Sequence, residues 1–248
     1  MDHLLLLLGA GALGAAMNAL AGGGSFVTFP ALIAVGLPSI VANASSTVAL
    51  FPAGLASAWA YRRGLTGVAG VPLAALLMVS LAGGLAGSVL LLTTPQATFD
   101  AAVPWLLLLA SLALAFGRQL GAALQRRMRL RPAPILVLQF VLAVYGGYFG
   151  AAVGIMMMAV WSLLGTADLK ELAPARTLVV TATNAIAVLC FILGSAVRWP
   201  ETLAMLVGAL VGGYLGALLA LRLPAMAIRM ATLALTFGLT AVFFLRSA

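Results

Sequence analysis

One arrangement of glycines occurs twice in this chain. A first apolar run breaks at the glycine-rich residues 22–25 and resumes as the short apolar segment 26–35. A second run breaks over residues 146–154, which include four glycines, and resumes as the segment 155–164. Two halves that each carry a glycine-interrupted hydrophobic segment are typical of secondary transporters. The repeat therefore predicts a membrane protein built from two homologous halves.

Smaller features recur at nearly the same spacing. The pattern Gly-Gly-x-x-Gly at residues 83–87 is matched by the same pattern at 212–216, an offset of 129 residues. Pro95 and Pro224 are separated by the same offset. Small residues four positions apart let two helices approach closely in a membrane. We therefore expect these two glycine groups to be helix contacts and not parts of a binding site.

The composition restricts the class of protein. Of 248 residues, 64% are hydrophobic and only 7% are charged, which is far from the balance of a soluble domain. So few charges cannot cover a soluble surface, whereas a bilayer removes that requirement. The net charge of +8 does not indicate nucleic acid, because cytoplasmic retention of basic residues and contact with acidic lipid headgroups account for it. The basic residues that cluster in one loop are Arg118, Arg126, Arg127, Arg129 and Arg131.

Eight segments are apolar enough to cross a bilayer, which takes about 20 residues. They are residues 4–21, 40–61, 67–92, 98–117, 134–152, 173–197, 201–221 and 225–245. The segments 26–35 and 155–164 are half that length and predict re-entrant half-helices, which need protein or a wet cavity around the broken backbone. The predicted fold is an all-α integral membrane protein with about eight transmembrane helices in two homologous four-helix repeats. The repeats would occupy residues 1–118 and 133–248, joined by an Arg-rich cytoplasmic linker at 119–132.

Basic residues in short loops set the expected orientation. Arg62 and Arg63 follow the second span and the Arg-rich linker follows two spans later, so both belong on the cytoplasmic side. With eight spans, both termini are then cytoplasmic and the halves run parallel. If each half-helix completes a crossing, the halves are inverted instead. The apolar N-terminus carries Asp2 and no basic residue ahead of its apolar run, so we interpret it as the first span and not as a signal peptide.

Polar residues inside the spans point to a binding site, because polar groups in a membrane are costly unless they are buried and bonded. If the sixth span starts at Ala173, Asn184 lies roughly 17 Å along it, near the midplane, and Arg176 shares its face. One arginine near several hydroxyl and amide donors suits an oxyanion, and the half-helix N-termini add backbone N–H groups. The predicted substrate-binding residues are Asn18, Gly23, Gly24, Ser25, Asn43, Ser46, Thr47, Gly150, Gly154, Arg176, Thr177 and Asn184.

Structural roles compete with binding for some polar residues. Asn43 also fits a helix N-cap. Arg176, one turn from the start of its span, also fits a side chain that extends to the membrane interface. Hydroxyls in membrane helices often bond back to their own helix or join two helices, and this is the interpretation we favour for Ser45, Thr181 and Thr183.

Enzyme motifs are weak in this sequence. Residues 9–14 match the dinucleotide-binding pattern Gly-x-Gly-x-x-Gly, but no strand precedes them and no acidic residue between Asp2 and Asp100 is present to bind a ribose. An intramembrane hydrolase needs a base, and the sole histidine, His3, lies at the terminus. One cysteine, one histidine and five carboxylates, none clustered within a span, offer no metal site. We therefore predict that the protein is not an enzyme and uses no cofactor or metal.

Two stretches resemble the signatures of a known family. Residues 18–30 (Asn-Ala-Leu-Ala-Gly-Gly-Gly-Ser-Phe-Val-Thr-Phe-Pro), followed by 41–50, resemble the first signature of the TauE/SafE family of sulfite exporters. Residues 144–154 resemble the second. Ser46 stands where the family typically has Asn, and Thr177 follows the arginine where a Lys-Asn pair is expected. The resemblance implies a small permease of the bacterial inner membrane that carries sulfite, organosulfonates or related sulfur compounds.

Three functions are compatible with the sequence. The first is an exporter of sulfur oxyanions that works by alternating access between the repeats. The second is a carrier of another small anion, such as an organic acid; a longer or more apolar cargo would use Phe26, Phe29 and Trp59. The third is a channel-like anion pore. The glycine-rich helix faces also suggest a homodimer in the membrane.

Overall fold

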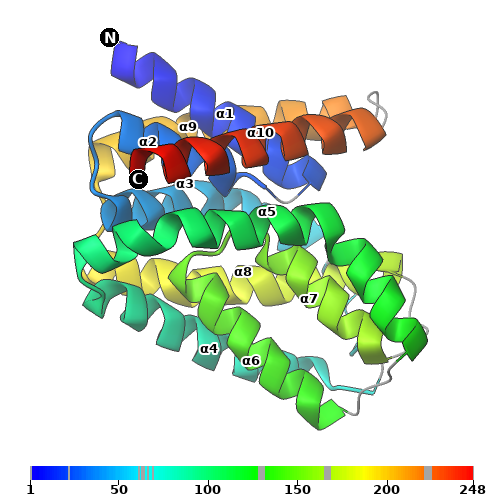
Figure 1. The fold of residues 1–248 in the computed structure, drawn as a ribbon. Helices are drawn as coiled ribbons and strands as arrows, with labels where there is room; N and C mark the ends of the chain where they lie inside the picture. The colour runs from blue at the N-terminus through cyan, green and yellow to red at the C-terminus, as the bar shows by residue number, and fades with distance from the viewer. Residues whose placement is uncertain are drawn as a thin grey trace.

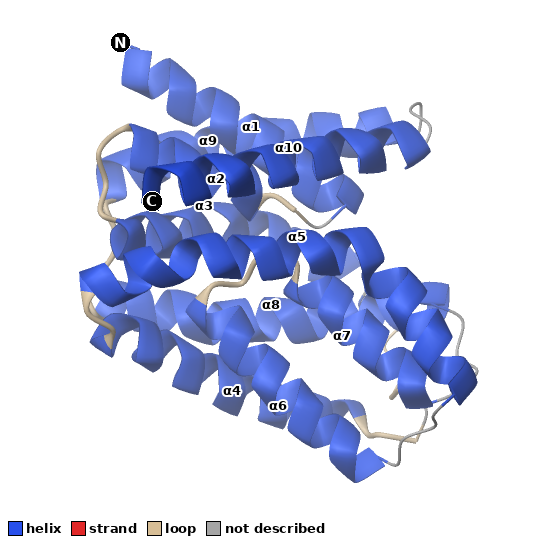
Figure 2. Cartoon of the chain, in the orientation of Figure 1, coloured by secondary structure: helices blue, strands red, loops and turns tan. Residues whose placement is uncertain are grey.

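The apolar segments form helices in the computed structural model (Figures 1 and 2). The structure describes residues 2–21, 23–60, 62, 65, 67–68, 70–127, 132–164, 169–220 and 225–247. Within these residues the α-helices are α1 (Asp2–Ala21), α2 (Ser25–Ala34), α3 (Ser39–Ala60), α4 (Leu73–Thr93), α5 (Gln96–Arg127), α6 (Pro132–Tyr148), α7 (Val153–Trp161), α8 (Leu169–Leu193), α9 (Trp199–Ala220) and α10 (Ala225–Ser247). A 3-10 turn, Ser162–Leu164, extends α7. The described chain is all-α, and its only extended pairing is a bridge between Val68 and Val71.

The helices coincide with the segments predicted from the sequence. Each of the eight long segments contains a helix, and the two short segments form α2 and α7. By length and apolarity, four helices of the described residues can cross a membrane: Ser39–Ala60, Leu73–Thr93, Gln96–Gly117 and Leu172–Leu193. The all-α membrane class is therefore supported. The count of eight spans and the re-entrant depth of α2 and α7 stay predictions.

One helix extends beyond its predicted span. The apolar pattern predicts an end at residue 117, but α5 continues to Arg127. The basic segment therefore begins as a helical extension, because its Leu, Ala, Gln and Arg residues all favour helix once the chain leaves the apolar region. Predicted features that lie outside the described residues are Gly22, Arg63, Arg129, Arg131 and Pro224.

The first helix of each half packs on a late helix of the other half. α1 lies along α9 and α6 lies along α4, while α3 contacts α8 and α5 contacts α10 between them. Glycines make the two outer contacts close: a Cβ atom on Gly87 would overlap the carbonyl oxygen of Val144, and one on Gly212 would overlap that of Ala12. The predicted helix-contact role of the two glycine groups is confirmed at Gly87 and Gly212.

The two termini lie at one end of the bundle, opposite to the Arg-rich end of α5 (Figure 1). α5 and α10 run antiparallel, since Ser111 and Thr240 share a hydrogen bond of 3.1 Å while Trp105, earlier in α5, contacts Phe244, later in α10. The eight-span count predicts one common side for the termini and the Arg-rich segment. In the structure α2 packs back on α1, and the chain returns to the end of the bundle where it began. The membrane side of the termini and of the Arg-rich segment stays a prediction.

We expect Gly11→Ala to destabilise the protein by about 1–3 kcal/mol, the usual cost of overpacking a filled contact. A Cβ atom there would overlap the backbone of Met205 on α9, which cannot move aside as a side-chain tip can. Gly9, on the same helix, is the matched control, because a Cβ atom on it meets nothing within 4 Å. Thermal unfolding in detergent measures the difference. Equal melting temperatures for the two variants would contradict the close contact between α1 and α9.

Candidate functional site

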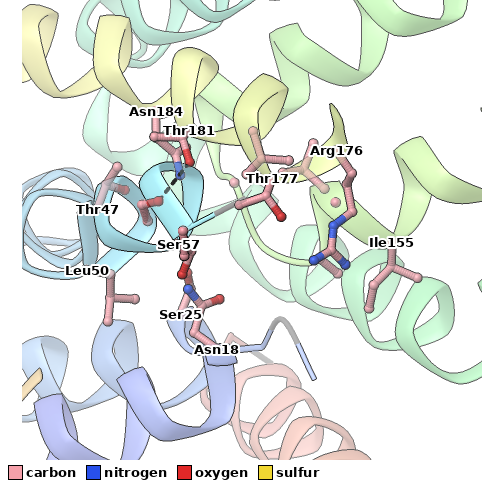
Figure 3. Close-up of a pocket in the computed structure, with 17 residues that line it drawn as sticks. Asn18, Ser25, Thr47, Leu50, Ser57, Ile155, Arg176, Thr177, Thr181 and Asn184 are labelled. Carbon is pink, nitrogen blue, oxygen red and sulfur yellow. Dashed lines mark hydrogen bonds between the residues drawn. The ribbon is translucent and has the colours of Figure 1, made fainter. Parts of the chain in front are cut away.

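A polar cavity of about 410 Å³ lies where the two helix breaks meet α3 and α8. Its walls come from the end of α1, the start of α2, the middle and end of α3, the turn before α7, and α8 (Figure 3). Eight of the twelve predicted binding residues line it: Asn18, Ser25, Thr47, Gly150, Gly154, Arg176, Thr177 and Asn184. The other four, Gly23, Gly24, Asn43 and Ser46, do not.

The second break has a backbone that only particular residues tolerate. After α6 ends, Gly150 has φ +80° and Ala152 has φ +57°, both in the left-handed region. The turn is held because the N–H groups of Phe149 and Gly150 donate to the carbonyl of Tyr145, whose hydroxyl donates to Ala151 O at 2.9 Å. α7 then starts beside the cavity and points its positive N-terminal end toward it.

Gly154 is the residue of α7 best placed to meet a ligand. It lines the cavity, and its N–H donates to no carbonyl of the described residues, as is usual in the first turn of a helix. A Cβ atom on it would lie 3.5 Å from Cδ of Arg176, an ordinary contact. The glycine therefore exposes a backbone donor next to the arginine.

The glycines of the first break do not line the cavity, and Gly24 is packed closely against α1. Gly23 and Gly24 are buried. A Cβ atom on Gly24 would lie 2.5 Å from the carbonyl oxygen of Gly14 on α1. The carbonyl of Gly24 also accepts the hydroxyl of Thr28 at 3.2 Å. Gly24 therefore lets α2 turn back tightly against α1, and Ser25, the next residue, lines the cavity.

The polar first turns of α3 hold neighbouring segments in place. Asn43 Nδ2 donates to the carbonyl of Tyr148 at 3.0 Å, so it fixes the end of α6 at the second break. Because α3 begins at Ser39, Asn43 is four residues inside the helix, and the N-cap interpretation is wrong. Ser46 shares a hydrogen bond of 2.6 Å with Thr28 of α2. Both side chains are almost fully buried. The sequence alone could not distinguish a polar side chain buried in the core from one that lines a cavity.

The three hydroxyls assigned to structural roles are bonded as expected. The hydroxyl of Ser45 accepts the N–H of Arg198 at 3.0 Å, which ties α3 to the start of α9. Thr183 donates back to the carbonyl of Val179 on its own helix. Thr181 donates to the carbonyl of Gly54 on α3 at 3.2 Å, and it also lines the cavity, which our sequence reasoning missed. Its spacing of three residues from Asn184 is the signal that places both on one face.

α8 presents a polar stripe to the cavity. Arg176, Thr177, Val180, Thr181 and Asn184 follow each other at helical spacing and all line it. Figure 3 shows Asn184 and Thr181 at one end and Arg176 beside Ile155 at the other. Arg176 is the only charged side chain among the described residues that line the cavity.

Some of the predicted hydroxyl donors are already used. Thr177 donates to Ala173 O at 2.8 Å, and Thr47 donates to Asn43 O at 2.9 Å. In this conformation these hydroxyls can only accept further hydrogen bonds, so they bind an anion poorly. The donors suited to an anion are fewer than the sequence indicated: the amides of Asn18 and Asn184, the hydroxyl of Ser25 and the N–H of Gly154, together with the positive charge of Arg176.

None of the described residues that line the cavity is aromatic. Phe26 and Phe29 are buried in the core, and Trp59 is 69% exposed with its ring beneath the guanidinium of Arg62, 4.3 Å from the ring centre. Their suggested role in holding a long apolar cargo is therefore not supported by the geometry. The apolar part of the wall is aliphatic and includes Leu50 and Ile155. Among the described residues, His, Cys, Asp and Glu form no group of three that could hold a metal ion.

Comparison with known proteins identifies relatives along almost the whole chain. A family model described as "Sulfite exporter TauE/SafE" matches residues 7–243. A probable membrane transporter protein of Haemophilus influenzae is 29% identical over 245 residues, which cover 97% of this chain and 94% of that protein. The probable membrane transporter protein ORF9 of a Sinorhizobium species is 30% identical, covering 86% of this chain and 82% of its own length. The probable membrane transporter protein YfcA of Escherichia coli K12 is 30% identical, covering 83% and 76%. No solved structure is significantly similar to this chain.

Proposed function

Because the chain belongs to the sulfite exporter TauE/SafE family, we propose that it is a secondary transporter that exports small sulfur-containing anions, such as sulfite or an organosulfonate, across the bacterial inner membrane. Its relatives are named as membrane transporters, so transport is the activity to test. The choice of an anion rests on the chemistry of the cavity.

One observation carries this choice: a single arginine faces a cavity with amide and backbone donors. A guanidinium binds an oxyanion through paired hydrogen bonds. The side-chain amides of Asn18 and Asn184, which also line the cavity, can donate further hydrogen bonds to the oxyanion. One positive charge matches a monoanion such as bisulfite or a sulfonate. The cavity, about 410 Å³, is within the range of roughly 300–1,000 Å³ that holds small organic ligands. Leu50 and Ile155 would accommodate a short carbon chain attached to the sulfonate.

The cavity opens toward the end of the bundle that carries basic residues. Ser57 and Ala60 line it, are exposed, and belong to the last turns of α3, just before Arg62. Since basic residues are retained in the cytoplasm, we assign the cavity mouth to the cytoplasmic side. An exporter collects its cargo on that side.

We also infer that the two halves form an inverted repeat. Gly208 packs on Leu8 and Gly212 on Ala12, so α1 runs parallel to α9. α1 and α6, the first helices of the two halves, start at opposite ends of the bundle (Figure 1). Inverted repeats with broken helices at their interface can expose one site to each side of a membrane in turn. The reciprocal packing of α1 on α9 and of α6 on α4 supports this arrangement.

Counterflow in proteoliposomes tests the proposed function. Vesicles loaded with unlabelled sulfite should accumulate labelled sulfite transiently, and an excess of a short organosulfonate should compete with it. A carboxylate of similar size that competes equally well would favour a general carrier of small organic anions. Flux that rises without saturation and without counterflow would favour a channel and would contradict a carrier.

We predict that export needs no dedicated protonatable residue of the protein. Glu201 lies in the first turn of α9 and Asp100 lies four residues after the start of α5, and neither lines the cavity. A negative-inside membrane potential drives a monoanion outward by about 2.3 kcal/mol per 100 mV. Each of the five acidic residues is neutralised in turn, and sulfite flux is measured under an imposed pH gradient. A single variant that keeps exchange but loses its response to the gradient would contradict this prediction.

A further inference from the structure

A second hollow of about 510 Å³ lies toward the opposite end of the bundle from the cavity mouth. It is lined by the end of α2, the start of α3, the first turns of α5 and one residue of α10. Three polar side chains meet there: Gln96 Nε2 donates to Ser39 Oγ at 2.7 Å and to Asp100 Oδ1 at 2.9 Å, and Ser39 Oγ donates to the same carboxylate. The hollow therefore has an exposed carboxylate where the cavity has an arginine.

One face of α2 connects the cavity with the hollow. Ser25, Phe29 and Ile33 are spaced by four residues, so they lie one above another on that face. Ser25 lines the cavity, and Ile33 lines the hollow. Phe29, between them, is only 1% exposed. Because an α-helix rises about 1.5 Å per residue, Ser25 and Ile33 are roughly 12 Å apart. Little more than two helical turns separate the two spaces.

Four aromatic rings fill this interval. The ring of Phe29 meets that of Phe149 edge-on, with 5.8 Å between their centres, and stacks on that of Phe243 at 5.9 Å. Phe99 of α5 lies 6.4 Å from Phe149. Phe149 immediately precedes Gly150 of the cavity, and Phe243 lines the hollow. We call Phe29, Phe99, Phe149 and Phe243 the aromatic plug.

The geometry points to a second access route: the hollow is the exit vestibule of the transport path, and the aromatic plug separates it from the cavity in this conformation. This inference rests on the proposed transport function. The plug is built from both halves of the chain, since Phe29 and Phe99 precede the Arg-rich segment and Phe149 and Phe243 follow it. A shift of α2 or α10 relative to α5 and the second break would therefore separate the rings, which meet through the contacts given above.

The two spaces differ in charge in the direction that export requires. Arg176 raises the local concentration of anions in the cavity, whereas the carboxylate of Asp100 lowers it in the hollow. An anion that passes the plug thus leaves an attractive region for a repulsive one. The vestibule would release a small anion, not store it.

Cysteine accessibility tests the plug without relying on transport. In a Cys190→Ser background, Ser25→Cys reports on the cavity, Ser57→Cys marks the face with the cavity mouth, and Ala101→Cys marks the face with the hollow. The probe is 2-sulfonatoethyl methanethiosulfonate, a membrane-impermeant anion, added to vesicles of each orientation. With the plug intact, the cysteine at position 25 should react only from the face that labels position 57.

Removing a ring should open the second route. With Phe29→Ala added, the cysteine at position 25 should also react from the face that labels position 101. Phe243→Ala should have the same effect and is the safer variant, because Phe243 is only partly buried. Phe191→Ala is the control, since Phe191 is equally buried on α8 but makes no ring contact in the described part of the chain.

Each outcome has a defined meaning. Labelling of position 25 from both faces while the plug is intact would overturn the inference. Labelling from one face only in folded Phe29→Ala and Phe243→Ala proteins would overturn it as well. Sulfite counterflow is measured separately on the Cys190→Ser protein, in which Ser25 is intact. If the labelling pattern holds but this protein shows no counterflow, the plug stands and the proposed cargo is contradicted, so the two failures are distinguishable.

Discussion

Arg176→Ala should abolish sulfite transport while leaving the protein folded and inserted. Arg176 is the only charged side chain among the described residues that line the cavity, and its neighbours there are amides, hydroxyls and aliphatic groups. Hydrogen bonds to charged groups contribute about 1.5–3 kcal/mol each, and every 1.4 kcal/mol is about tenfold in affinity. Loss of two such bonds lowers anion affinity by roughly two orders of magnitude or more. Initial rates of sulfite counterflow measure the effect.

The matched variants separate charge from geometry. Arg176→Lys should retain part of the activity, because the positive charge survives but the two-pronged guanidinium does not. Arg198→Ala should transport normally, since Arg198 lies at the start of α9 and pairs with Glu201 at 3.6 Å. Normal sulfite flux through the Arg176→Ala protein would show that the Arg176 side chain only extends to the membrane interface. It would also contradict the assignment of the anion-binding site to this cavity.

Gly154→Ala and Gly24→Ala should fail in different ways. A methyl group on Gly154 fits, with its nearest neighbour at 3.5 Å, so the protein should fold. It would cover the backbone N–H beside Arg176 and lower sulfite affinity by about tenfold, the value of one hydrogen bond to a charged group. A methyl group on Gly24 would press on the carbonyl of Gly14 at 2.5 Å, so that variant should lose stability first.

Two measurements distinguish these results. Size-exclusion profiles and melting temperatures in detergent report folding, and the sulfite concentration at half-maximal flux reports binding. Gly238→Ala is the control for both, because a Cβ atom there meets nothing within 4 Å. A stable Gly154→Ala protein with unchanged half-maximal concentration would exclude the N-terminus of α7 from the anion site.

The helix positions follow from the sequence because apolar runs and glycine breaks decide where membrane helices start and stop. α2 and α7 begin within two residues of the predicted 26 and 155. The course of the chain between the helices was harder to predict. A short segment that turns back along the preceding helix and one that stays at the end which that helix has reached have the same hydropathy, and only the contacts between α1 and α2 distinguish them.

The site was predictable in part for a similar reason. Arg176 and Asn184 are polar and Gly154 is small, and neither property stabilises a helix that faces lipid. All three residues line the cavity. Asn43 and Ser46 have the same sequence signal but bond to Tyr148 and Thr28 instead. A polar residue within an apolar run indicates that a polar group will be buried. Its hydrogen-bond partner cannot be predicted in the same way, because the partners of Ser46 and Asn43 are 18 and 105 residues away in the chain.

The packing of α1 on α9 also has a consequence for biogenesis. Leu8 meets Gly208, so the partner surface of the first helix leaves the ribosome about 200 residues after the helix itself. At roughly 5–20 residues per second, α1 waits on the order of 10–40 s in the membrane with its glycine face uncovered. α6, by contrast, finds α4 already synthesised. The N-terminal helix is therefore the element that a chaperone or insertase must shield, and chains truncated before α9 should be degraded although most of their helices are present.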